Sequence, residues 1–194
     1  MRNLKPANLL NNTGPEAISA HLDIIPLGKV DPLALSVVAA NLKSIMGINA
    51  RILPPRPDPL YAFMPMRNQY DAGKILLHLA DIKDGARFRL GVAHLDIFTP
   101  ILTFVFGESQ LGGNAAIVSL FRIHDPDPAL IYERAAKIAL HEIGHLIGIV
   151  HCRTPDCLMG FSSNLERLDG LPLRFCSACE YEASCCLSRL LKNP

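Results

Sequence analysis

The segment HEIGHLIGIVH, residues 141–151, contains three histidines and one glutamate. In a helix, side chains four positions apart lie on one face, so His141 and His145 can direct imidazole nitrogens at the same metal ion. Glu142 lies about 100° further around the helix axis. It can therefore reach a water molecule on the metal rather than the metal itself. The pattern predicts a zinc-binding helix with Glu142 as general base.

Gly148 and His151 extend this pattern beyond the helix. Glycine adopts the left-handed conformation that ends helices, so the chain can turn at Gly148 and bring His151 back as a third ligand. Three protein ligands leave one position of a tetrahedral zinc ion open for water, which is typical of catalytic sites. The alternative, a core helix with incidental histidines, is disfavoured because burying two imidazoles and a carboxylate without a metal is costly.

All six cysteines lie between positions 152 and 186. Four of them form two short-spaced pairs, Cys152 with Cys157 and Cys176 with Cys179. This spacing is typical of a structural zinc site, in which four thiolates fill the coordination sphere. Such a site would pin the loop after the histidine helix to the start of the last helix. Two disulfides are the alternative, and the lack of a signal-like apolar segment at the N-terminus argues against them.

The composition excludes several other classes of protein. The chain has 194 residues, 49% of them hydrophobic, and its net charge of +1 provides no field to attract nucleic acid or an anionic membrane. The near-neutral charge also argues against a four-cysteine module that reads nucleic acid. No apolar stretch approaches the roughly 18 residues of a membrane span. Residues 1–17 are predicted to be an irregular N-terminal arm. We expect the protein to be cytoplasmic and monomeric.

Hydrophobic periodicity and turn residues predict the elements that position these side chains. We expect strands at 21–28, 48–53, 89–98, 101–109 and 114–123, and helices at 32–46, 68–82, 129–148 and about 177–191, with a proline-rich loop at 54–65. Asp31 is predicted to cap the first helix and Gly47 to end it. This order describes a mixed sheet with helices packed on it.

The full run HExxHxxGxxHC-x4-C-x-M-x16-CxxC, from His141 to Cys179, resembles the archaemetzincins, a branch of the metzincin zinc peptidases. Metzincins in general share the histidine part, and the cysteine continuation singles out the archaemetzincins. The resemblance implies a mixed α/β (α+β) metzincin-like fold, with a five-stranded mixed sheet, a backing helix and an active-site helix. It also implies that Met159 is the Met-turn residue beneath the histidines.

The resemblance further implies one catalytic domain over 1–194, with an N-terminal subdomain (1–148) and a small C-terminal subdomain (149–194). The implied activity is peptide-bond hydrolysis by a zinc-activated water with Glu142 as general base, on a peptide or protein substrate. Two zinc ions per chain are implied, one catalytic and one structural. The sheet edge around Thr103 to Gly107 is implied to pair with an extended substrate. The alternative is a zinc-stabilised peptide-binding protein with little or no proteolytic activity, although such a protein has no need of Glu142.

Other residues of these types are expected to have structural roles. These are His21, His78, His94 and His124, each in a different element, and Cys185 and Cys186, which are expected to pack around the last helix. Glu108 is expected in a solvated turn. Some metzincins use a tyrosine near the Met-turn to stabilise an oxyanion, and this device is expected to be absent because no tyrosine occurs between 152 and 180.

Overall fold

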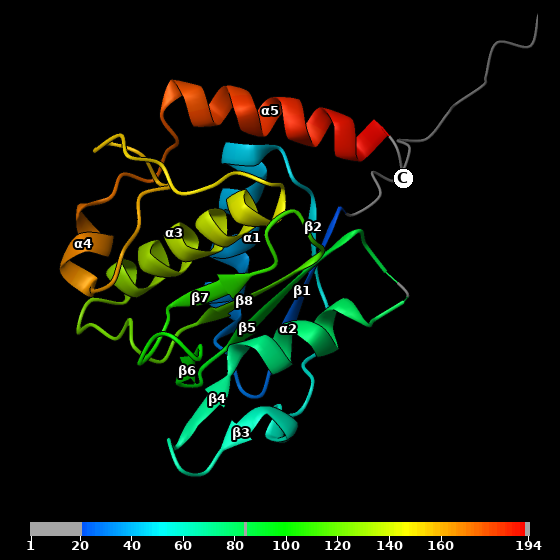
Figure 1. The fold of residues 1–194 in the computed structure, drawn as a ribbon, viewed down its shortest axis with the longest axis vertical. Helices are drawn as coiled ribbons and strands as arrows, with labels where there is room; N and C mark the ends of the chain where they lie inside the picture. Colours follow the sequence, from blue (N-terminus) through cyan, green and yellow to red (C-terminus); the bar gives the residue numbers. More distant parts are fainter. Residues whose placement is uncertain (1–20, 84, 193–194) are drawn as a thin grey trace, which may run out of the picture.

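A five-stranded mixed sheet in the order β2-β1-β5-β8-β7 forms the centre of the fold (Figure 1). The computed structural model describes residues 21–83 and 85–192, so the arm predicted for residues 1–17 lies outside the described residues. The strands are β1 (Leu22–Leu27), β2 (Ala50–Ile52), β5 (Phe88–Ala93), β7 (Gly107–Ser109) and β8 (Ala115–Ser119). The first four in sheet order are parallel, and β7 runs antiparallel to β8 at the edge. The predicted mixed sheet of five strands is confirmed.

Helices cover both faces of this sheet. One face packs against α1 (Pro32–Met46) and α3 (Pro128–Leu146), and the other packs against α2 (Ala72–Ala80). Every residue of β1, β5 and β8 is buried, as expected for parallel strands between two layers of helices. The two hydrophobic cores therefore lie on opposite sides of the sheet.

Aspartate caps fix where the two long helices begin, and the cap predicted for the first of them is confirmed. Asp31 accepts a hydrogen bond from the Leu33 amide at the start of α1, and Gly47 ends that helix with φ 67°. Asp127 caps α3 in the same way. The Tyr132 hydroxyl of α3 also donates to the Asp31 carboxylate over 2.9 Å. The start of the histidine-bearing helix is therefore tied to the start of the helix beside it.

Several segments predicted as single helices, strands or loops contain additional short elements in the structure. The predicted helix 68–82 is shorter, because residues 69–71 form β4 (Gln69–Asp71) and Asp71 caps α2. The predicted strand 89–98 is two strands, because β5 ends at Ala93 and β6 (Ile97–Phe98) joins a separate sheet in the order β3-β4-β6. The proline-rich loop contains a 3-10 helix (Leu60–Ala62) and β3 (Phe63–Met64).

The segment beyond α3 carries two helices. The final helix, α5 (Ser177–Lys192), was predicted almost to the residue. The short helix α4 (Leu165–Gly170), which Asn164 caps, lies in a region expected to be loop. None of the helices in the described part of the chain has the length and apolar character needed to cross a bilayer.

Candidate active site

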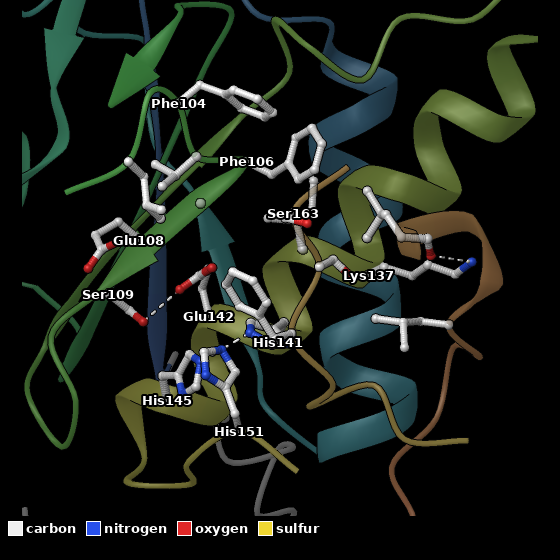
Figure 2. A pocket seen from close by; sticks show the side chains of 18 of the residues that line it. Phe104, Phe106, Glu108, Ser109, Lys137, His141, Glu142, His145, His151 and Ser163 are labelled. Atoms are coloured by element: carbon white, nitrogen blue, oxygen red, sulfur yellow. Dashed lines mark hydrogen bonds between the residues drawn. The ribbon is translucent and has the colours of Figure 1, made fainter. Parts of the chain in front are cut away.

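The three histidines of the 141–151 segment converge at the C-terminal end of α3 (Figure 2). The Nε2 atoms of His141 and His145 lie 3.0 Å apart. The centroid of the His151 ring lies 5.3 Å from the centroid of the His141 ring and 4.6 Å from that of the His145 ring. One ring nitrogen of each histidine lies within 4.8 Å of the others. The helix ends at Leu146, and Gly148 has φ 104°, which reverses the chain and returns His151 to the site.

Backbone carbonyls orient the two helical imidazoles. His141 Nδ1 lies 2.9 Å from the Leu158 oxygen, and His145 Nδ1 lies 2.7 Å from the Ile149 oxygen. A neutral imidazole that donates from Nδ1 keeps a lone pair on Nε2, which is the usual arrangement of metal-bound histidine. Burial lowers the pKa of His141 to about 4, so the ring is neutral at pH 7.

These donors fit a zinc ion. Nitrogens bound 2.0–2.1 Å from zinc at a tetrahedral angle lie about 3.3 Å apart, close to the Nε2 separation observed. Zinc accepts neutral imidazole ligands. A metal at this point would be held by His141, His145 and His151.

Glu142 is buried beside the histidines, with 7% of its side chain exposed. The Ser109 hydroxyl donates a hydrogen bond to its Oε2 over 2.7 Å (Figure 2). Burial raises the pKa of Glu142 to about 8, because a buried site disfavours the charged carboxylate. A cation held by the histidines would lower that pKa, because a nearby positive charge favours the carboxylate.

The four paired cysteines form a second cluster. Their sulfur atoms lie within 4.8 Å of one another, with Cys152 Sγ and Cys176 Sγ 3.9 Å apart. Sulfurs bound about 2.3 Å from a tetrahedral zinc ion lie about 3.8 Å apart. All six thiols, each within the described residues, are free rather than paired in disulfides. A hydrogen bond from the Cys179 backbone amide contributes most to lowering the pKa of Cys176 to about 6, which favours the thiolate that binds metal.

One loop, residues 151–159, belongs to both clusters. It begins with His151 and Cys152, which are adjacent in the chain. Further along, Cys157 contributes a thiol while the next residue, Leu158, accepts the hydrogen bond from His141 Nδ1. The Cys152 amide donates to the Met159 oxygen over 2.9 Å and closes the loop. The cysteine cluster therefore shapes the loop that completes the histidine cluster.

Met159 is fully buried beneath the histidine-bearing turn of α3. A Cβ atom on Gly144 would lie 2.5 Å from its sulfur, so the helix can approach Met159 only because residue 144 has no side chain. Sequence reasoning singled out Met159 but not the glycine that accommodates it.

We expect Gly144→Ala to destabilise the protein. Alanine gains about 1 kcal/mol over glycine in a helix, but overpacking a buried site typically costs about 1–3 kcal/mol, and the fully buried Met159 side chain must shift to admit the new Cβ atom. Urea denaturation should show a lower free energy of unfolding. Gly170→Ala is the matched control, because a Cβ there meets nothing within 4 Å, and it should leave stability unchanged or raised. A Gly144→Ala midpoint equal to that of Gly170→Ala would contradict the close contact.

A pocket of about 320 Å³ opens beside the histidines and Glu142. Apolar side chains dominate its walls (Figure 2). They come from the segment before β7, from α3, and from the chain around α4: Leu102, Phe104, Val105, Phe106, Ile138, Leu158, Phe161, Leu168 and Leu171. The Phe104 and Phe106 rings lie 5.4 Å apart, and the Arg122 guanidinium lies 4.4 Å from the Phe104 centroid.

Two buried cations of α3 hold α4 against this pocket. Arg134 makes a two-pronged contact of 2.7 Å at each oxygen with the Asp169 carboxylate. Lys137 lines the pocket, but its ammonium contacts the Glu133 carboxylate at 2.7 Å and donates to the Leu168 and Asp169 carbonyls. The Lys137 ammonium is therefore paired with groups of α3 and α4 rather than with the interior of the pocket.

The structure leaves the remaining candidate residues outside the two clusters. His21, His78, His94 and His124 belong to neither cluster among the described residues, nor do Cys185 and Cys186. Glu108 differs from the expectation of a solvated turn, because it lies on β7, half-buried, and lines the pocket. The predicted substrate edge at 103–107 is also shifted, since the strand begins only at Gly107.

Sequence reasoning did not identify Ser109, which hydrogen-bonds Glu142. Alternate residues of a strand share a face, so Gly107 and Ser109 both face α3 in β7. The alternation of residues along β7 points to Ser109 only when the strand is already known to lie beside Glu142.

Comparisons with known proteins show the family to which the chain belongs. The model of peptidase family M54 matches residues 49–184. The archaemetzincin of Archaeoglobus fulgidus is 37% identical over 150 residues, which cover 77% of this chain and 91% of that protein. The archaemetzincin of Methanocaldococcus jannaschii is 35% identical over 162 residues, which cover 80% and 88% of the two chains.

Solved structures show the same fold. The crystal structure of archaemetzincin from Methanopyrus kandleri superposes with a TM-score of 0.82 at 31% identity, covering 90% of this chain and 99% of that one. The A. fulgidus structure gives a TM-score of 0.75 at 34% identity, covering 83% and 99%. The chain therefore belongs to peptidase family M54, the archaemetzincins, and is a zinc metallopeptidase.

Proposed function

We propose that this chain cleaves peptide bonds at the three-histidine site, with Glu142 as general base, and that it holds two zinc ions, one at each cluster. The observation that carries the proposal is the buried Glu142 carboxylate beside three converging imidazoles at the mouth of a pocket. Zinc held by His141, His145 and His151 supplies Lewis acidity and lowers the pKa of water.

The residues of the chain supply the remaining steps. The Glu142 carboxylate takes a proton from the attacking water and delivers it to the leaving amine nitrogen. In the described part of the chain, the outer edge of β7 pairs with no other strand, so it is available to hydrogen-bond an extended peptide. The apolar pocket beside it has room for a substrate side chain. The substrate class is therefore a peptide or an unfolded segment of a protein.

The test compares the zinc-loaded wild type with Glu142→Ala on a diverse peptide library. We expect the variant to lose about 10²–10⁴-fold in kcat/KM, the usual contribution of a general base. Zinc content should stay at the wild-type level because Glu142 is not a ligand. Equal cleavage by both proteins would indicate a contaminating protease or another base. Absence of cleavage by the wild type would overturn the proposal and favour a peptide-binding protein.

A further inference from the structure

The Glu142 carboxylate has a single anchor in the fold. Ser109 Oγ donates to Oε2 over 2.7 Å, and within residues 21–83 and 85–192 no other group hydrogen-bonds this carboxylate. The Glu142 side chain is otherwise largely buried, and it lines the pocket beside the histidines. A single polar contact therefore fixes its orientation.

The opposite side of the carboxylate rests against Gly107. A Cβ atom at this position would lie 2.7 Å from both Cγ and Oε1 of Glu142, so only the bare glycine backbone fits there. Gly107 and Ser109 lie on the same face of β7, two residues apart. Together they form a slot for the carboxylate, in which Gly107 lies against Oε1 and Ser109 bonds Oε2.

The position of this slot is fixed by the sheet. β7 pairs with β8 in an antiparallel register that places Gly107 opposite Val118 and Ser109 opposite Ala116. Both partners in β8 are fully buried. Ser109 is therefore positioned by strand pairing with β8 rather than by a loop.

We propose that Ser109 is a positioning residue that fixes the Glu142 carboxylate in the orientation needed for proton transfer. The inference rests on the proposed function of Glu142 as base. Serine suits this role because its hydroxyl is a neutral donor. It orients the carboxylate without cancelling its charge, whereas a lysine or arginine at position 109 would form an ion pair and reduce its basicity.

The size of the effect follows from geometry. A misplacement of about 1 Å can lower a rate about 100-fold, and loss of one hydrogen bond allows the carboxylate to rotate within the slot. The effect should fall on kcat, because the Ser109 hydroxyl is engaged by the Glu142 carboxylate and the substitution leaves the backbone of β7 unchanged. We expect Ser109→Ala to lower kcat about 10–100-fold with KM changed less than about twofold.

The kinetic test uses zinc-loaded full-length protein. Ser109→Thr keeps the hydroxyl and should restore most of kcat, which a loss of packing alone does not explain. In a Glu142→Ala background, Ser109→Ala should cause no further loss, because the two residues act as one unit. Ser36→Ala is the matched control, since Ser36 is exposed on α1 and bonds only the Pro32 carbonyl. An unchanged kcat in Ser109→Ala, or a failure of Ser109→Thr to rescue it, overturns the inference.

A binding measurement separates this inference from the proposed function. Acetohydroxamic acid is a zinc chelator, and its N–H and O–H can donate to the Glu142 carboxylate. Calorimetric titration should show its affinity about tenfold weaker in Ser109→Ala than in the wild type. The same change should vanish in a Glu142→Ala background. If the wild type cleaves no peptide but this difference is present, the peptidase proposal fails and the positioning role stands. Equal affinities in the two proteins overturn the positioning role.

Discussion

Replacing Cys176 with serine is expected to remove the zinc ion of the cysteine cluster and to destabilise the protein by several kcal/mol. The four thiols join the loop after α3 to the first turn of α5, and two of them are buried. Structural zinc contributes an apparent binding free energy of about 10–16 kcal/mol in small zinc-finger peptides. Losing even part of this exceeds the roughly 1 kcal/mol of an ordinary substitution.

The same substitution is expected to weaken the histidine site. The loop 151–159 carries His151 next to Cys152, and it carries the Leu158 carbonyl that orients His141. When the cysteines no longer hold this loop, the third ligand and the carbonyl partner both lose their fixed positions. Loss of such outer-shell support typically costs about 10–100-fold in metal affinity. Cys176→Ser therefore acts on the catalytic site although its thiol is not one of that site's ligands.

Zinc analysis and urea denaturation check both effects. The wild type should contain two zinc ions per chain, and Cys176→Ser should contain at most one and unfold at lower urea. Cys185→Ser is the matched control, because Cys185 lies on α5, the helix that directly follows Cys176, but outside the cluster, and it should keep both ions and the wild-type midpoint. Two zinc ions and an unchanged midpoint in Cys176→Ser would show that Cys176 does not hold a structural zinc ion.

The sheet and the long helices could be predicted because their signals are local. The Asp31 cap, the Gly47 terminus and the Asp127 cap each depend on a few adjacent residues. The short elements could not be predicted in the same way. β4 and β6 have three and two residues and pair with each other across the chain, so no local periodicity marks them. α4 has six residues, and contacts with Arg134 and Lys137 of α3 hold it in place.

The histidine and cysteine clusters could be predicted for a related reason. Their residues lie close together in the sequence, and the helical spacing of His141 and His145 defines their geometry without knowledge of the fold. Ser109 and the apolar pocket depend on β7 and α3, which are 33 positions apart at the Ser109–Glu142 contact. Contacts of that kind become visible only when the sheet order is known.

Replacing His145 with alanine is expected to remove the zinc ion of the histidine site and to abolish peptide cleavage. The substitution deletes one of three proposed ligands, which leaves too few donors for tight binding. The Ile149 carbonyl also loses its imidazole partner, a change of about 1 kcal/mol in a hydrogen bond of this kind. His78→Ala is the control, because His78 is exposed on α2 and lies outside both clusters. It should keep both zinc ions and full activity.

The two clusters should respond unequally to the two substitutions although their coupling is mutual. If zinc at the cysteines strengthens the histidine site, zinc at the histidines strengthens the cysteine site by the same factor. His145→Ala should therefore weaken the cysteine site by about 10–100-fold as well. That site should stay filled, because this loss is small beside the about 10–16 kcal/mol of four-thiolate binding. Titration with a chelator should find one tightly held zinc ion in His145→Ala and none in Cys176→Ser. A tightly held ion in Cys176→Ser would show that the histidine site does not depend on the loop.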